Sequence, residues 1–359
     1  MKKKLEQVLE EKHFDSVVLY RAPYQSDSQI ILGNAELIHN GINEHHLTSD
    51  GFVFEPFDNT ITPGIFIPTH FSATFTQLAK NEQKLIGSLF KTEKNRAPQK
   101  ADDYSDYVAH FDKMHNAITN NQLSKVILSR TVKGPHLPSN SVPRVFEALR
   151  QKYPHAFVYA ISTPNGGTWM GAGPELLLKH DGQRLSTVSL AGTLPNTPSA
   201  KWSEKELKEQ GLVTEFIENV LIHHQVDSIE YKNAETISAG QVKHLCSRFQ
   251  FEMQKTNGNH IGILYDLHPT PAVCGLPKEN AFNLITDTEQ HERRYYAGFL
   301  GPVKNGHYEF YVNIRCLSLT EDATCLYVGG GLTIDSVAEK EWQETALKAE
   351  TLLSVIKNI

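Results

Sequence analysis

Tight two-residue turns between apolar segments are the feature that most limits the folds open to this chain. Asp-Gly and Asn-Gly dipeptides between such segments are typical of β-hairpins. Two of these turns are Asp181-Gly182, between residues 175–180 and 184–192, and Asn305-Gly306, between residues 296–303 and 307–319. Because parallel strands need crossover connections of a dozen residues or more, the turns predict antiparallel sheets.

Helical periodicity is confined to a few long segments between groups of hairpins. Apolar residues recur with a helical period over residues 104–118, and a capping box of Ser203 and Glu206 opens a helix over 203–221. Residues 336–356 form the last predicted helix. Since helices do not follow every strand, the pattern predicts an α+β fold rather than a doubly wound sheet.

Composition and charge exclude several classes of protein. The 41 acidic and 35 basic residues give a net charge of −6, and the only basic run is the short Lys2-Lys3-Lys4, so no nucleic-acid partner is predicted. No apolar run approaches a membrane span, and glutamates interrupt residues 5–14, which excludes a signal peptide there. The four cysteines are widely spaced, which is typical of reduced thiols in a cytoplasmic protein.

One carboxylate lies at a position where the helical spacing of apolar residues predicts an apolar side chain. Glu209 precedes Leu212, Val213 and Phe216 by three, four and seven residues, so it shares their buried helix face. A carboxylate in that position is costly unless it is paired, hydrogen-bonded or bound to a metal. A salt bridge to Lys or Arg and a metal site both remain open.

The last predicted helix carries Glu341, Glu344 and Lys348 on one stripe. Such a stripe is typical of a solvated face, but here it follows a strand that ends in Gly329-Gly330-Gly331. Three glycines let backbone amides approach an anion. Two carboxylates together with Glu209 would suit magnesium rather than zinc.

Two charged residues interrupt segments that otherwise predict strands. Lys125 begins the apolar Val126-Ile127-Leu128 run, and Glu175 directly precedes Leu176-Leu177-Leu178. A lysine and a glutamate fixed on opposed strands could act as general base and general acid. The alternative is two strand-end charges that face solvent.

Other site signatures are absent or weak. The chain contains no nucleotide-binding GxxxxGK[ST] motif, no GxGxxG after a strand, no GxSxG and no HExxH. His39, His45 and His46 with Asp50 could bind a metal, although a polar surface loop is the simpler interpretation.

Seven segments together resemble the chorismate-utilising enzymes, which include isochorismate, salicylate, anthranilate and aminodeoxychorismate synthases. The similarity runs from about residue 104 to the C-terminus, with the segments in the family's order. They are SKVILSR, GPELLL, SLAGT, SEKELKEQGLV, LHPTPAVCGLP, the hairpin from YYAG to NIRC, and GGG followed by EKEWQETALKAE. The resemblance implies two large stacked antiparallel sheets flanked by helices, with a variable N-terminal part over residues 1–100 and a chorismate-binding catalytic domain over residues 101–359.

Site roles follow from the resemblance, position by position. It implies that Glu209 and Glu344 bind Mg²⁺, with Glu341 reaching the ion directly or through water, and that the ion holds the ring carboxylate of chorismate. The residues implied to bind the rest of the substrate are Tyr296, Arg315 and the amides of Gly329 and Gly331 at the enolpyruvyl carboxylate, Lys348 near the metal-bound carboxylate, and Thr193 and His268 along the ring.

The resemblance also indicates the reaction. Members that add ammonia carry glutamine at the position of Lys125, and aminodeoxychorismate synthases carry a nucleophilic lysine at the position of Ala191. Water is therefore the expected nucleophile, activated by Lys125 for attack at C2, while Glu175 protonates the departing C4 hydroxyl. The chain is expected to be a cytoplasmic, Mg²⁺-dependent isochorismate synthase of menaquinone or siderophore biosynthesis, a monomer or homodimer with no glutaminase subunit. The alternatives are a salicylate synthase and a non-catalytic chorismate-binding protein.

Overall fold

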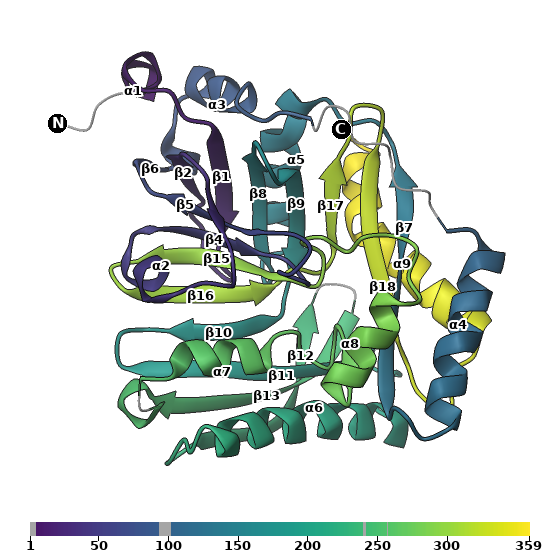
Figure 1. Cartoon of the computed structure of the whole chain (residues 1–359). Coiled ribbons are helices and arrows are strands. Elements are labelled where there is room, and N and C mark those ends of the chain that lie inside the picture. The colour runs from purple at the N-terminus through teal and green to yellow at the C-terminus, as the bar shows by residue number, and fades with distance from the viewer. Residues whose placement is uncertain (1–4, 93–101, 240–241, 257) are drawn as a thin grey trace.

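The computed structural model describes residues 5–92, 102–239, 242–256 and 258–359, and these residues form two nine-stranded sheets (Figure 1). Every strand pair in both sheets is antiparallel, as the hairpin turns predict. Sheet A contains, in spatial order, β14 (Gly275–Leu276), β7 (Lys125–Gly134), β18 (Thr324–Leu332), β17 (Cys316–Leu319), β9 (Gly167–Gly173), β8 (Phe157–Thr163), β1 (Ser16–Arg21), β2 (Gln29–Gly33) and β6 (Phe71–Thr74).

Sheet B lies against sheet A, and its strands run across those of sheet A in Figure 1. Its strands, in spatial order, are β12 (Glu230–Ala239), β13 (Val242–Glu252), β11 (Arg184–Pro195), β10 (Leu176–His180), β16 (His307–Val312), β15 (Phe299–Lys304), β4 (Gly51–Glu55), β5 (Gly64–Pro68) and β3 (Glu36–Ile38).

Turn chemistry explains the hairpins that sequence predicted. Asn305 and Gly306, between β15 and β16, have φ angles of 52° and 74°, so both adopt the left-handed conformation that a type I′ turn requires. Gly182, between β10 and β11, has a φ of 96°, which favours glycine. Both predicted hairpins are confirmed.

Helices cover the sheets. The three predicted long helices are confirmed, and in one of them Glu206 accepts a hydrogen bond from the Ser203 N–H at 2.8 Å, as the capping box requires. The helices are α1 (Leu5–Glu11), α2 (Glu44–Thr48), α3 (Lys80–Gly87), α4 (Tyr104–Thr119), α5 (Val142–Lys152), α6 (Glu204–His223), α7 (His260–Leu267), α8 (Lys278–Thr286) and α9 (Ala338–Ile356). None of the described helices is long and apolar enough to cross a membrane.

The core divides at sheet A because successive strand residues point to opposite faces. In β8, Phe157, Tyr159 and Ile161 pack in the larger apolar cluster, which also contains residues of sheet B. Val158 and Ala160 face the other way, into a second cluster with α5 and α9. Sheet A is therefore buried on both faces, one against sheet B and the other against helices.

The N-terminal residues are built into both sheets. β1 pairs with β8 in sheet A, and β4 pairs with β15 in sheet B. The boundary predicted at residue 100 lies outside the described residues, so the domain division there stays a prediction.

Candidate active site

A pocket of about 160 Å³ gathers most of the residues that sequence analysis singled out. Segments from sheet A, sheet B, α6 and α9 meet around it. The pocket is lined by Ile127, Pro174, Glu175, Leu190, Ala191, Gly192, Glu206, Glu209, His244, Ala272, Val273, Tyr296, Ile314, Arg315, Tyr327, Val328, Gly329, Gly331, Glu341, Glu344 and Lys348. Nine of the twelve predicted site residues are in this lining.

Lys125 lies just behind the lining, at the start of β7. Its side chain is 1% exposed, and its Nζ donates to Oε1 of Glu209 at 2.7 Å. The expectation that Glu209 needs a partner is thereby confirmed, and the partner is a lysine from sheet A. This pair links α6 to sheet A at the wall of the pocket.

Glu175 has the environment of a proton donor. The residue is 4% exposed, and its Oε1 accepts a hydrogen bond from the Thr270 hydroxyl at 3.0 Å. Burial raises the pKa of the Glu175 carboxyl to about 7, against the opposing effects of the Thr270 hydrogen bond and the positive charges of Lys125 and Arg315. The alternative that Lys125 and Glu175 are solvent-facing charges is wrong because both are buried.

The stripe on α9 is solvated only in part, because the side chain of Glu344 is 44% exposed and that of Lys348 is 26% exposed. Glu341 is 4% exposed, and its Oε1 accepts from the Ser336 hydroxyl at 2.8 Å. Lys348 pairs with Glu344 at 2.8 Å and donates to the Gly329 carbonyl at the same distance. α9 thus presents two carboxylates and one ammonium to the pocket and is tied to β18.

Glycine is required where β18 passes the pocket. A Cβ on Gly329 would lie 2.7 Å from the Tyr296 hydroxyl, and one on Gly331 would lie 3.0 Å from Cε of Lys125. Both distances are shorter than ordinary van der Waals contact. The glycine run therefore lets β18 lie directly against two of the predicted site residues.

Arg315 supplies positive charge to the pocket, and a neutral histidine, His244, lies beside it. Its Nη2 lies 3.5 Å from Nε2 of His244, whose Nδ1 lies 2.8 Å from the Gly192 carbonyl. Burial, followed by the charge of Arg315, lowers the pKa of His244 to about 4. A neutral ring with Nδ1–H donating to Gly192 and Nε2 accepting from Arg315 satisfies this geometry.

Besides Lys125, two other predicted site residues are not in the lining. His268 lies near a separate cavity, where its Nε2 is 3.2 Å from the Pro56 carbonyl, and burial lowers its pKa to about 3. Its expected contact with the substrate ring is not supported by this placement. The side chain of Thr193 lies outside the described part of the structure.

Sequence reasoning missed His244 and Thr270. Thr270 belongs to the LHPTP segment, in which the family resemblance indicates His268 instead. His244 carried one local signal, since it is a polar residue beside Leu245 and Cys246, in the segment that forms β13. The histidines at 39, 45 and 46 do not join Asp50 in any group of converging metal ligands among the described residues.

Comparison with known proteins identifies the family. The family model described as "Chorismate binding enzyme" matches residues 65–357. The vibriobactin-specific isochorismate synthase of Vibrio cholerae is 28% identical over 264 residues, covering 70% of this chain and 66% of that protein. Isochorismate synthase EntC of Escherichia coli is 30% identical over 245 residues, covering 65% of this chain and 62% of its own length. The matches thus span less than two thirds of these relatives.

The fold is also found in a solved structure, that of a putative 2,3-dihydroxybenzoate-specific isochorismate synthase, DhbC, from Bacillus anthracis. Its TM-score is 0.77 at 22% identity, and the match covers 98% of this chain and 99% of that one. This likeness confirms the predicted α+β fold with two large antiparallel sheets. Because the family model matches most of its residues, the chain belongs to the chorismate binding enzyme family.

Proposed function

We propose that this protein is an isochorismate synthase, which converts chorismate to isochorismate by adding water at C2 and losing the C4 hydroxyl. The relatives named above, each called an isochorismate synthase, support the proposal. The observation that carries it is the pair of buried groups at the pocket, Lys125 and Glu175, with a glutamate whose pKa is about 7.

Lys125 and Glu175 divide the proton transfers between them. Lys125 accepts a proton from water as the water oxygen bonds to C2, and Glu175 gives a proton to the C4 oxygen as the C4–O bond breaks. The ring double bonds shift, one water enters and one leaves, so atoms and charge balance. In the present structure Lys125 is the ammonium partner of Glu209, so it must lose a proton before it can accept one.

The nature of the pocket wall supports water rather than an amine as the nucleophile. Ala191 lines the pocket and has no side-chain nucleophile. Lysine rather than glutamine occupies position 125, as expected for members that add water. No glutaminase subunit is therefore proposed. The side chains of the four cysteines are buried thiols, which fits the expected cytoplasmic compartment.

Cationic groups suit a substrate with two carboxylates. Arg315 and Lys348 line the pocket beside Gly329 and Gly331, and we assign Arg315, Tyr296 and the glycine amides to the enolpyruvyl carboxylate. Burial raises the pKa of the Tyr296 phenol, so its hydroxyl stays a hydrogen-bond donor. Lys348 adds positive charge near the ring carboxylate.

The acidic side of the pocket suits magnesium. Glu206, Glu209, Glu341 and Glu344 all line it, and carboxylate oxygens are the ligands that Mg²⁺ prefers. We propose that Glu209 and Glu344 hold the ion, with Glu341 directly or through water. When bound, Mg²⁺ would supply positive charge that neutralises and orients the ring carboxylate.

Magnesium dependence can be tested by removing either the ion or its ligands. Excess chelator should abolish turnover, and added Mg²⁺ should restore it. Glu209→Ala and Glu344→Ala should each lose turnover while circular dichroism stays that of the wild type. The matched control is Glu230→Ala, since Glu230 is exposed and pairs with Arg184 at the surface. Full activity in chelator would contradict the metal assignment.

Product analysis tests the reaction itself. After incubation with chorismate and Mg²⁺ at neutral pH, chromatography should detect isochorismate in reversible equilibrium with chorismate. Stoichiometric salicylate and pyruvate without an added lyase would show a salicylate synthase instead. Chorismate binding without any product would show a non-catalytic chorismate-binding protein.

A further inference from the structure

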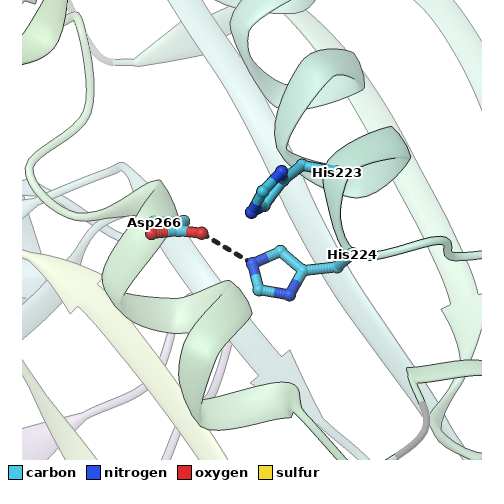
Figure 2. Close-up of side chains that lie close together, drawn as sticks. All are labelled: His223, His224 and Asp266. Atoms are coloured by element: carbon cyan, nitrogen blue, oxygen red, sulfur yellow. Dashed lines mark hydrogen bonds and ion pairs between the residues drawn. The ribbon is translucent and has the colours of Figure 1, made fainter.

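Three potential metal ligands converge where α6 ends. His223 is the last residue of α6, His224 follows it as the C-cap, and Asp266 lies on α7. One ligand atom from each lies within 4.8 Å of the other two, and Nε2 of His224 is 2.7 Å from Oδ2 of Asp266. Figure 2 shows a ring nitrogen of each histidine and an oxygen of Asp266 turned toward a common space.

The spacing of these atoms is close to that of a coordination sphere. Tetrahedral ligands about 2.0–2.1 Å from Zn²⁺ are about 3.4 Å apart. Atoms that lie up to 4.8 Å apart therefore need to approach by no more than about 1.4 Å, and Nε2 of His224 and Oδ2 of Asp266, now 2.7 Å apart, need to separate by about 0.7 Å. Both shifts are within the reach of side-chain rotation. His223 is exposed and Asp266 is half exposed, so both can adjust and water can reach the ion.

The end of α6 favours a cation. The last carbonyls of a helix carry partial negative charge, and α6 is 20 residues long. Asp266 adds a carboxylate to the same place. Two imidazoles, one carboxylate and a helix C-terminus together attract a divalent ion rather than an anion.

A fourth residue can orient the buried histidine. Nδ2 of Asn259 lies 3.0 Å from Nδ1 of His224, on the side of the ring opposite Asp266. With a metal on Nε2, the ring proton moves to Nδ1, and the Asn259 amide turned over would accept it through its oxygen. Ligating histidines commonly donate their second ring N–H in this way, which fixes the ring.

We propose that His223, His224 and Asp266 form a binding site for Zn²⁺ or a similar borderline transition metal, with Asn259 positioning His224. Two imidazoles and one carboxylate suit such an ion, whereas Mg²⁺ prefers oxygen ligands alone. Water completes the coordination. Since the ligands come from α6 and α7, the bound metal cross-links these helices. The site is distinct from the carboxylate pocket, and the proposal does not depend on the proposed function.

Metal titration of the full chain, stripped with chelator, tests the site. Calorimetry should detect Zn²⁺ binding, and Co²⁺ should give the visible absorption of a tetrahedral site. His223→Ala and Asp266→Asn should weaken Zn²⁺ binding at least tenfold, and Asn259→Ala by about 10- to 100-fold. Zn²⁺ should raise the melting temperature of the wild type by more than it raises that of His223→Ala, because only the wild type holds all three ligands. The matched control is His136→Ala, at an exposed histidine elsewhere.

Three results would overturn the proposal, all measured on variants whose circular dichroism matches the wild type. One is Zn²⁺ affinity that is unchanged in both His223→Ala and Asp266→Asn. Another is loss of Zn²⁺ binding in Glu209→Gln while His223→Ala and Asp266→Asn still bind the ion, which would assign Zn²⁺ to the carboxylate pocket. The third is the absence of measurable binding to the wild type. None of them depends on chorismate turnover, so they leave the proposed reaction to its own test.

Discussion

At the scale of single residues, the buried Glu175 carboxyl provides the sharpest prediction. Glu175→Gln keeps the shape but cannot donate the proton, so kcat should fall about 10²–10⁴-fold. In the wild type only the protonated acid donates, and the pKa is about 7. Glu175 should therefore make kcat/KM decline as pH rises through about 7. Steady-state kinetics between pH 5.5 and 9, roughly one to two units either side of that pKa, measures both effects.

The control for Glu175 is Thr270→Val, which removes the hydroxyl that donates to Glu175 and leaves the acid itself. Because that hydrogen bond lowers the pKa of Glu175, its loss should move the alkaline limb to higher pH. A Glu175→Gln variant with a kcat near the wild type would show that another group protonates the C4 hydroxyl.

Residues were predictable from sequence where a charge broke an apolar pattern. Glu209, Lys125 and Glu175 all stood out for this reason, and all three prove to lie at the pocket. Local pattern left the partner of Glu209 open, because Lys125 is 84 residues away in the chain. Thr270 has no such signal, since its importance is the contact with Glu175 and a lone threonine is ordinary in a loop.

At the scale of elements, the glycine run of β18 should be intolerant of side chains. In Gly329→Ala the new methyl group would meet the Tyr296 hydroxyl at 2.7 Å and force the strand or the ring to shift. Displacement of a group at a binding site by about 1 Å costs on the order of 10- to 100-fold in turnover. Comparison of kcat/KM for the variant and the wild type measures the loss.

Gly211→Ala on α6 is the matched control for Gly329→Ala. A Cβ there meets nothing within 4 Å, and the residue is exposed. Alanine in a helix interior should raise the free energy of unfolding by about 0.5–1 kcal/mol without loss of turnover. Equal activity of the two alanine variants would contradict the role given to the β18 glycines.

Elements were predictable where the signal was local. The hairpins β10–β11 and β15–β16 follow from two-residue turns, and α4, α6 and α9 follow from their apolar period and caps. The N-terminal strands were not placed by sequence reasoning because their partners are distant: Leu19 pairs with Ala160, and Val53 pairs with Gly301. No local pattern specifies such pairing.

At the scale of the whole molecule, the pocket exists only because distant segments meet. Its wall combines β7, β11, β13 and β18 with α6 and α9, so the two sheets must stack before any site is formed. Sequence alone indicated unusual charges, and the family resemblance related them to one another. The structure adds His244 and the Lys125–Glu209 pair, which neither composition nor periodicity predicts.

The source of the new hydroxyl group shows whether water attacks the ring. Chorismate incubated with the protein and Mg²⁺ in ¹⁸O-labelled water should yield isochorismate that carries the label at its C2 hydroxyl, located by mass spectrometry. The same reaction with added ammonium should yield no anthranilate. Isochorismate without label, or anthranilate as the main product, would contradict the account of Lys125 as the base that activates water.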